Sequence, residues 1–262
     1  MREQRTIFGE VAELYDRARA GYPDALIDDV LAHAGWVAGS RMRALEIGAG
    51  TGKATVAFAA HDVDVLALEP DAAMAAVLSR NCRDFPHVRV ELTTFEDWAA
   101  SESGFDLLFS AQAWHWVPRD VRRRRASEAL RSGGTIALFW HRTDWREEPV
   151  RDDLDDVYRS VAPALHEKEP GFPGLAPPRG DPGVAELSGS DCFVDIATRA
   201  YPWSASLTTE TFVEVALTQS DHRLLDEATR DRLFDAVKGG ISSQGGQISV
   251  PHLTFLVLAR AT

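Results

Sequence analysis

Residues 44–52 read ALEIGAGTG, and this stretch decides the fold. Its first four residues are apolar except for Glu46, as in a short buried strand, and its last five include three glycines. Glycine lets the backbone turn sharply and lets a ligand come close to bare amide groups. Parallel sheets bind ligands at this place, beyond the carboxyl ends of their strands. The stretch therefore predicts a strand, a ligand-binding turn and then a helix over Lys53–Ala60.

The spacing of the glycines separates this turn from two phosphate-binding motifs. A dinucleotide-binding G-x-G-x-x-G turn would need its third glycine at position 53, which is Lys53. A phosphate loop needs Gly-Lys-Ser/Thr, whereas Gly52-Lys53-Ala54 lacks the hydroxyl that would hold Mg²⁺. Neither phosphate motif fits the turn.

Short apolar runs alternate with helical stretches on both sides of the turn. Such alternation is typical of parallel βαβ units, so we predict an α/β fold whose helices cover both faces of a sheet. The expected strands are residues 44–47, 63–68, 88–92, 105–110 and 135–140, and the expected helices are residues 11–18, 24–34, 53–60, 72–80 and 121–130.

The pattern loosens after Trp140. We expect an acidic helix over 147–165, a Pro/Gly-rich loop over 170–183, a strand over 192–203, two helices over 209–217 and 221–238, and a last strand over 252–259. The late helices would form a cap between the last two strands. We predict a single domain over 1–262, with N-terminal helices in 1–40, a ligand-binding core in 41–142, and the rest of the sheet with helical cap insertions in 143–262.

Composition excludes several classes of protein. The 28 Lys and Arg residues stand against 40 Asp and Glu, and the formal net charge of −12 argues against a nucleic-acid partner. Two cysteines make no disulfide framework. The N-terminal residues lack a signal-peptide core, and no apolar run approaches the ~20 residues that span a bilayer. We therefore expect a cytoplasmic protein with no membrane partner.

Residues 44–52 closely resemble the first motif of class I S-adenosylmethionine (SAM)-dependent methyltransferases. Glu69, at the end of the second expected strand, matches the acidic residue that holds both ribose hydroxyls in that family. The resemblance implies a Rossmann-like sheet, mostly parallel with a final antiparallel strand, and SAM as cofactor with S-adenosylhomocysteine (SAH) as product. Thr209–Arg260 resembles more loosely the branch that contains trans-aconitate methyltransferases.

The same resemblance assigns a set of cofactor-binding residues. They form the glycine turn, the end of the second strand, the adenine-flanking segment after the third strand, the segment after the fourth strand that meets the methionine part, and an N-terminal arginine for the carboxylate. In that order they are Glu46, Gly48, Ala49, Gly50 and Gly52; Glu69 and Pro70; Phe95 and Glu96; Ser110 and Gln112; and Arg19. Plainer interpretations remain open: tight-turn glycines, a helix-start Glu69 and a surface Arg19. Glu46 is expected either to bind the ligand or to order the glycine turn through backbone amides.

The segments after the fourth and fifth strands suggest the acceptor. Residues 110–114 lack the Asn/Asp-Pro-Pro-aromatic motif of many methyltransferases that act on nucleic-acid bases or glutamine, which favours a small molecule. Four tryptophans fall in these segments, and we expect at least two to line a pocket for an apolar or aromatic acceptor: Trp114, Trp116, Trp140 and Trp145. His115 and His141 are candidate general bases, with a structural role as the alternative for each.

Other charged runs receive a plain interpretation. Arg122–Arg125 and the aspartates of 152–156 are expected to be solvated helix faces, and no His, Cys or carboxylate set has metal-ligand spacing. We predict methyl transfer to an oxygen of a small organic acceptor. Two alternatives stay open: a SAM-binding sensor or partner subunit without catalysis, and, less favoured, an NAD(P)-linked oxidoreductase.

Overall fold

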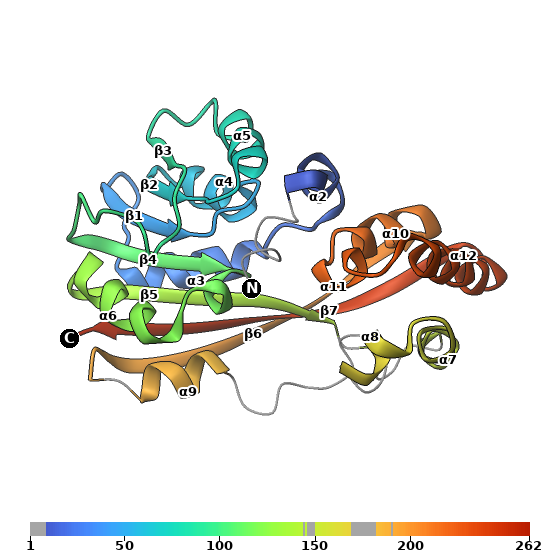
Figure 1. The fold of residues 1–262 in the computed structure, drawn as a ribbon. Helices are drawn as coiled ribbons and strands as arrows, with labels where there is room; N and C mark the ends of the chain where they lie inside the picture. The colour runs from blue at the N-terminus through green and yellow to red at the C-terminus, as the bar shows by residue number, and fades with distance from the viewer. Residues whose placement is uncertain (1–8, 144, 146–149, 169–181, 190) are drawn as a thin grey trace.

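A seven-stranded sheet forms the centre of the computed structural model, which describes residues 9–143, 145, 150–168, 182–189 and 191–262 (Figure 1). The strand order is β3-β2-β1-β4-β5-β7-β6. The pairs from β3 through β5 are parallel, and β7 runs antiparallel to both β5 and β6. The predicted mostly parallel sheet with a final antiparallel strand is therefore confirmed.

The element bounds follow the sequence pattern closely in the first half of the chain. The strands are β1 (Met42–Ile47), β2 (Val63–Leu68), β3 (Val88–Glu91), β4 (Phe105–Ala111), β5 (Leu130–Thr143), β6 (Phe193–Thr208) and β7 (Gln247–Ala261). The helices are α2 (Ala12–Ala18), α3 (Asp24–Ala34), α4 (Lys53–Ala59), α5 (Ala72–Asn81), α6 (Arg119–Ala129), α7 (Arg151–Val161), α8 (Pro163–Lys168), α9 (Pro182–Ser188), α10 (Thr209–Leu217), α11 (Ser220–Arg223) and α12 (Glu227–Ser243), with short 3-10 turns η1 (Gly9–Val11) and η2 (Trp114–Trp116).

Alternating strand residues build one apolar cluster on each face of the sheet. Leu107 and Phe109 of β4 pack with α3 and α4 on one face, whereas Leu108 packs with α6 and α9 on the other. Because both faces are covered, β1 and β2 are apolar over almost their whole length. This arrangement leaves the carboxyl ends of the parallel strands as the edge at which a ligand can enter.

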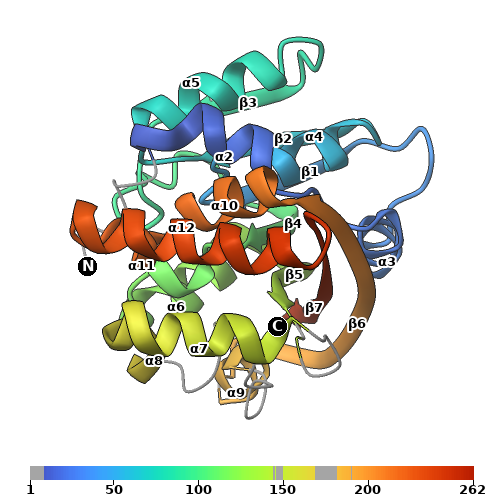
Figure 2. The ribbon, with the colours of Figure 1, turned by 90° about the vertical axis from the view of Figure 1, so that its right-hand side faces the viewer.

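A third apolar cluster lies beyond that edge and forms a cap from α7, α8, α10 and α12 (Figure 2). The cap is carried by β6 and β7, which continue past the sheet as a two-stranded ladder and end where Thr208 pairs with Gln247. Helix α10 also contacts the N-terminal helix α2, where Arg17 forms an ion pair with Glu214 at 2.9 Å.

The structure corrects several expected bounds in the second half. The last two strands are longer than predicted, so Ser204–Thr208 and Gln247–Pro251 belong to the ladder and not to the cap insertion. The expected helix over 221–238 is interrupted before Asp226, whose carboxylate caps α12. The helix over 147–165 breaks at Ala162, before Pro163, because proline cannot continue a helix.

Two expectations in this half fall partly outside the described residues. These are the start of the acidic helix, residues 147–149, and the loop over 170–183, of which only Pro182 and Gly183 are described, as the first turn of α9. Within the described residues, no helix is both long and apolar enough to cross a bilayer.

Candidate active site

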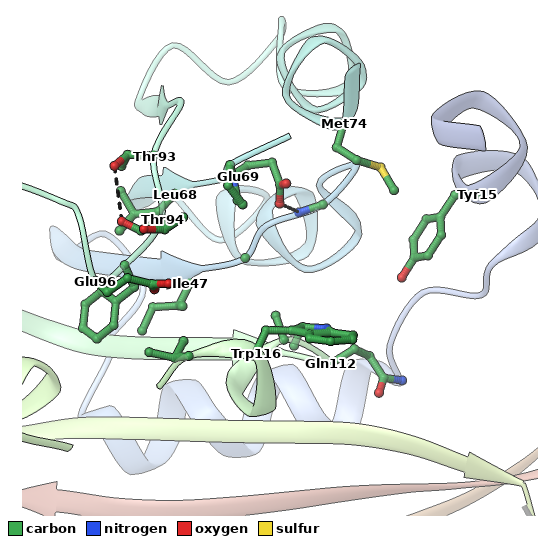
Figure 3. Close-up of a pocket in the computed structure, with 17 residues that line it drawn as sticks. Tyr15, Ile47, Leu68, Glu69, Met74, Thr93, Thr94, Glu96, Gln112 and Trp116 are labelled. Atoms are coloured by element: carbon green, nitrogen blue, oxygen red, sulfur yellow. Dashed lines mark hydrogen bonds between the residues drawn. The ribbon is translucent and has the colours of Figure 1, made fainter. Parts of the chain in front are cut away.

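A pocket opens at the carboxyl ends of β1, β2 and β4, at the edge that the glycine turn faces (Figure 3). The predicted cofactor residues that line it are Gly48, Gly50, Glu69, Pro70, Phe95, Glu96 and Gln112. The predicted residues that do not line it are Arg19, Glu46, Ala49, Gly52 and Ser110. Residues that sequence reasoning did not assign to the cofactor also line it: Tyr15, Ile47, Leu68, Met74, Thr93, Thr94, Ala111, Ala113, Trp116 and Val117.

The glycine turn is held against β2 and needs its glycines. The amide N–H groups of Gly48 and Ala49 both donate to the carbonyl oxygen of Leu68, at 2.9 and 3.1 Å. Gly48 has φ +67°, and a Cβ there would lie 2.4 Å from the Cβ of Ala113. Only glycine combines this backbone conformation with so close an approach of the two loops. The turn thus brings its backbone to the pocket wall.

Glu69 ties the glycine turn to the end of β2. Its carboxylate accepts the amide N–H of Gly50 at 2.7 Å (Figure 3). It also accepts the amide N–H of Asp71 at 2.9 Å. Burial raises the pKa of Glu69 to about 7, although both backbone hydrogen bonds favour the charged form. Each carboxylate oxygen has a second lone pair, so the group can still accept hydroxyl protons from a ligand.

Glu46 lies in the middle of β1 and does not reach the pocket. One carboxyl oxygen accepts the Thr55 hydroxyl of α4 at 2.5 Å, and the other is buried without a partner. The expectation that it orders the glycine turn through backbone amides is wrong for this structure, because its partner is a helix side chain. Burial raises the pKa of Glu46 to about 8, so the neutral acid is the favoured form near pH 7.

A neutral, buried Glu46 makes stability depend on pH. Between about pH 4.5 and pH 8 the folded state keeps a proton that the unfolded chain has lost, so the free energy of unfolding falls as pH rises. One such group accounts for about 1.4 kcal/mol per pH unit at most. Glu46→Gln, which retains an oxygen for Thr55, is expected to lower this slope by about one proton in urea titrations from pH 6 to 8, and Glu69 keeps its own contribution up to about pH 7. An unchanged slope would contradict a neutral Glu46.

The segment after β3 forms one wall of the pocket. Phe95 is buried and packs near Trp98 and Trp114, while Arg125 of α6 donates to its carbonyl oxygen at 3.0 Å. Glu96 lines the pocket beside it. Leu68 and Met74 also line this pocket, so its wall offers apolar atoms of the kind that pack against a flat ring.

Tyr15 and Met74 enter the pocket from helices and were not predicted as site residues (Figure 3). Tyr15 lies in α2, one helical turn before Arg19, and Met74 lies in the first turn of α5. Asp71 caps α5 by accepting the amides of Ala73 and Met74, which sets the direction of that turn. The sequence signal available was the cap itself, since it places Met74 in the first turn of a helix, five residues after Glu69.

Ser110 and Gln112 differ in their roles although both follow the core of β4. The Ser110 hydroxyl is buried and donates to the Ile47 carbonyl at 2.9 Å, so it joins β4 to β1 and does not face the pocket. Gln112 has φ +62°, a conformation that is unusual for a residue with a side chain, and its amide donates to the Phe139 carbonyl. Strain of this kind is found at ligand sites.

Arg19 lies between the N-terminal helix and the cap. Its Nε donates to the Thr218 hydroxyl at 2.7 Å, and its guanidinium lies 5.4 Å from the centre of the Tyr15 ring. It does not line the pocket as placed, although Tyr15 does. The plain alternative of a simple surface arginine is also wrong, because the side chain is half-buried and joins α2 to α10.

His141 is fully hydrogen-bonded at the end of β5. Its Nε2 donates to the Gly21 carbonyl at 3.1 Å, and its Nδ1 accepts from the Thr254 hydroxyl, which in turn accepts from the indole N–H of Trp203. Burial lowers the pKa of His141 to about 4. Because its lone pair is already used, the arrangement favours a positioning role over the base role suggested by sequence. His115 is exposed, with its ring 4.7 Å from that of Trp116.

A second cavity of about 660 Å³ adjoins the pocket and shares Gln112 with it. Trp114 and Trp140 line this cavity, and Trp116 lines the pocket; that they pack against an acceptor stays a prediction. Trp145 instead packs in the cap core. Both candidate bases, His115 and His141, also border the second cavity.

The plain interpretation of Arg122–Arg125 is wrong. Arg122 is 4% exposed, pairs with Glu186 of α9, and donates to the carbonyls of Trp114 and Val117. Arg125 donates to backbone carbonyls after β3, and of this run only Arg124 has the expected exposed i,i+4 pair on its own helix. Helix periodicity could not show this, because the partner of Arg122 is remote in sequence.

Comparisons with known proteins agree with this geometry. Residues 44–134 match the family described as "Methyltransferase domain". An uncharacterized methyltransferase of Mycobacterium tuberculosis is 25% identical over 98% of this chain and 97% of its own length. A candidate type II methyltransferase of Anaeromyxobacter dehalogenans superposes with a TM-score of 0.59 at 19% identity, covering 92% of this chain and 96% of the other.

One solved neighbour carries ligands. Phosphoethanolamine N-methyltransferase 2 of Haemonchus contortus, solved with phosphomonomethylethanolamine and SAH, has a TM-score of 0.55 at 14% identity and covers 96% of this chain and 57% of its own. At such identities the structural likeness concerns the fold alone.

The strand order, the glycine turn beside Glu69 and these matches support a class I SAM-dependent methyltransferase that uses SAM as cofactor. The matches do not distinguish the trans-aconitate branch from other branches. The residues present fit SAM: a glycine turn with no room for a side chain at Gly48, a buried carboxylate at Glu69, and apolar side chains of Met74 and Phe95 in the pocket wall. Among the described residues, no group of three or more His, Cys, Asp or Glu side chains could hold a metal.

Proposed function

We propose that this enzyme transfers a methyl group from SAM to an oxygen atom of a small organic acceptor. The observation that carries the proposal is the junction at Gln112, where the pocket beside the glycine turn meets a second cavity large enough for a small molecule. An in-line displacement needs two ligands held end to end, and adjoining cavities supply that arrangement. The negative net charge and the absence of the Asn/Asp-Pro-Pro-aromatic motif support a small acceptor over a nucleic acid.

Several residues of this chain would hold the cofactor. Glu69 would accept the two ribose hydroxyls, Phe95 and Met74 would flank the adenine ring, and the backbone from Gly48 to Gly50 would face the methionine part. Arg19 would reach the carboxylate only by leaving Thr218, so its role as a ligand requires a small movement of the cap against α2. When bound, SAM supplies a methyl group that an acceptor oxygen attacks as the carbon–sulfur bond breaks, and the electron pair of that bond stays on the sulfur of SAH.

The chain's own contribution to the chemistry is alignment and exclusion of water. A hydroxyl acceptor must also lose a proton, and His115 is the candidate to take it because it borders the second cavity. The cap would close the site over both ligands. We treat it as part of the same domain, because β6 and β7 continue from the sheet into the cap without a linker.

Calorimetric titration tests the cofactor assignment. We expect SAH to bind the wild-type protein with micromolar affinity and NAD⁺ not to bind, and Glu69→Ala to weaken SAH by roughly tenfold or more through loss of two charge-assisted hydrogen bonds. Glu128→Gln removes an exposed carboxylate remote from the pocket and is the matched control. Binding of NAD⁺ in place of SAH, or an unaltered affinity in Glu69→Ala, would contradict the assignment.

A non-catalytic sensor or partner subunit is the alternative that this titration does not separate, because it would bind SAH equally well. Turnover of any acceptor in a screen with methyl-labelled SAM distinguishes the two. The second cavity favours an enzyme, since a sensor needs no space for another ligand beside the cofactor.

A further inference from the structure

The second cavity has an unusual charge for this protein. The whole chain carries a formal net charge of −12, yet this one cavity is bordered by four arginines. Among the described residues that line it, Glu186 is the only acidic side chain. Its complete described lining is Gln112, Trp114, His115, Arg119, Arg122, Arg123, Trp140, His141, Arg142 and Glu186.

Two of these arginines are used to build the wall. Arg122 is buried, is neutralised by Glu186, and donates to two backbone carbonyls of the η2 segment. Arg123 donates to the carbonyl of Glu186, which fastens α6 to α9. These contacts hold the cavity wall in place, and the negative charge of Glu186 is neutralised by Arg122.

The other two arginines, Arg119 and Arg142, have no ion pair or hydrogen bond among the described residues. Arg119 begins α6, and Arg142 follows His141 near the end of β5, so they reach the cavity from two different elements. Both are exposed to solvent. Two unpaired guanidinium groups at one cavity form a site that prefers an oxyanion, because each can donate paired N–H groups to carboxylate or phosphate oxygens.

The rest of the described lining includes two indole rings, those of Trp114 and Trp140. Trp140 borders the cavity from β5, and Trp116 borders the adjoining pocket, which shares Gln112 with the cavity. A ligand that spans this space would place an apolar body against indole rings and its anionic end at the arginines.

We propose that the acceptor carries a carboxylate or phosphate group, which Arg119 and Arg142 bind while its apolar part packs along Trp140 towards Gln112. This inference rests on the proposed function, because it assigns the second cavity to the acceptor. It narrows the expected apolar or aromatic acceptor to one with an acidic group.

Calorimetry on the full-length, SAH-saturated protein tests this with three probes that share a phenyl ring: phenylacetate, phenyl phosphate and the neutral phenylacetamide. We expect at least one anionic probe to bind tenfold or more tightly than the amide. Whichever anion binds more tightly identifies the group as carboxylate or phosphate. Arg119→Gln and Arg142→Gln are each expected to weaken the anionic probe by about tenfold, with partial recovery in the corresponding lysine variants, which keep charge but lose paired donation.

Arg124→Gln is the matched control, because Arg124 lies on the same helix but pairs with Glu128 and does not line the cavity. It should leave all three affinities unchanged. Equal affinity for amide and anion, no detectable binding of either anion at millimolar concentration, or unaltered binding in both arginine variants would overturn the proposal. SAH affinity is measured in every variant, so failure of the cofactor assignment would be seen separately as loss of SAH binding in the wild type.

Discussion

Replacing Gly48 with alanine is expected to weaken SAH binding by at least a hundredfold, about 2.7 kcal/mol. The new Cβ would lie 2.4 Å from the Cβ of Ala113, well inside the contact distance of ~3.5–4 Å between carbon atoms. Neither atom belongs to a flexible side chain, so the glycine turn and the segment after β4 would have to separate. Both segments line the cofactor pocket, and the change therefore acts directly on the binding site.

Two companion variants separate the clash from the cost of the backbone conformation. Gly35 has φ +78° with nothing within 4 Å of a built Cβ, so Gly35→Ala should cost about 1 kcal/mol of stability and leave SAH affinity unchanged. Ala113→Gly combined with Gly48→Ala removes the clashing Cβ and should recover most of the affinity. Binding within threefold of wild type in Gly48→Ala, or no recovery in the double variant, would show that this close approach does not shape the pocket.

The free energy of unfolding is expected to peak near pH 6.5 and to fall on both sides. Burial lowers the pKa values of His141, His222 and His252 to about 4. Between about pH 6.5 and pH 4 these histidines therefore bind protons in the unfolded chain but not in the folded protein, and the free energy of unfolding falls as the pH is lowered. The raised pKa values of Glu46 and Glu69 act in the opposite sense between about pH 4.5 and pH 7–8.

The two sets of groups combine into a specific profile. Between pH 6.5 and 4.5 three histidines outweigh two glutamates, so stability falls by about 1.4 kcal/mol per pH unit on acidification. Below pH 4.5 the glutamates become protonated in both states, and the folded histidines also take up protons near pH 4, so the slope decreases towards zero at lower pH. Above pH 6.5 only the glutamates act, and stability falls as pH rises.

Urea titrations across pH 4 to 8 measure this profile, and two variants assign its limbs. His222 is 2% exposed and bonded to the Tyr158 hydroxyl at 2.7 Å, so His222→Gln should flatten the acid limb by about one proton. The exposed His115 serves as the control, and His115→Gln should leave the curve unchanged. A profile that rises steadily from pH 6 to 8 would show that Glu46 and Glu69 are charged when buried.

Much of the first half of the fold was predictable because its signals are local. The strand over Val63–Leu68 has the bounds read from its apolar run, and helix α10 has those read from its spacing. Glycines at 48, 50 and 52 have positive φ, which their sequence position after a strand had indicated. Likewise, Glu69 ends β2 beside the turn because the lengths of β1, α4 and β2 set that distance.

The candidate site was predictable only in part, because sequence signals are local and the site is assembled from elements that are distant in the sequence. Residues on the turn and strand ends were found, whereas Tyr15 reaches the pocket from a helix whose packing no local pattern reports. Ser110 was placed on the correct strand, but its side chain faces the sheet interior, where it bonds the Ile47 carbonyl. Whether a side chain at the end of a strand points to a ligand or to an adjacent strand depends on how the two strands pack, which the sequence of one strand does not report.

The sequence by itself determined the α/β class, the glycine turn and its acidic partner, because hydrophobic periodicity and backbone sterics act within a few residues. Only the tertiary structure decided which arginines of α6 form ion pairs and which do not. Arg122 was indistinguishable from Arg119 in a run of polar helix residues, yet Arg122 is neutralised by Glu186, which is 64 residues away, and Arg119 is not. Burial and ion pairing are properties of the packed elements, so the character of the second cavity became visible only when β5, α6 and α9 came together.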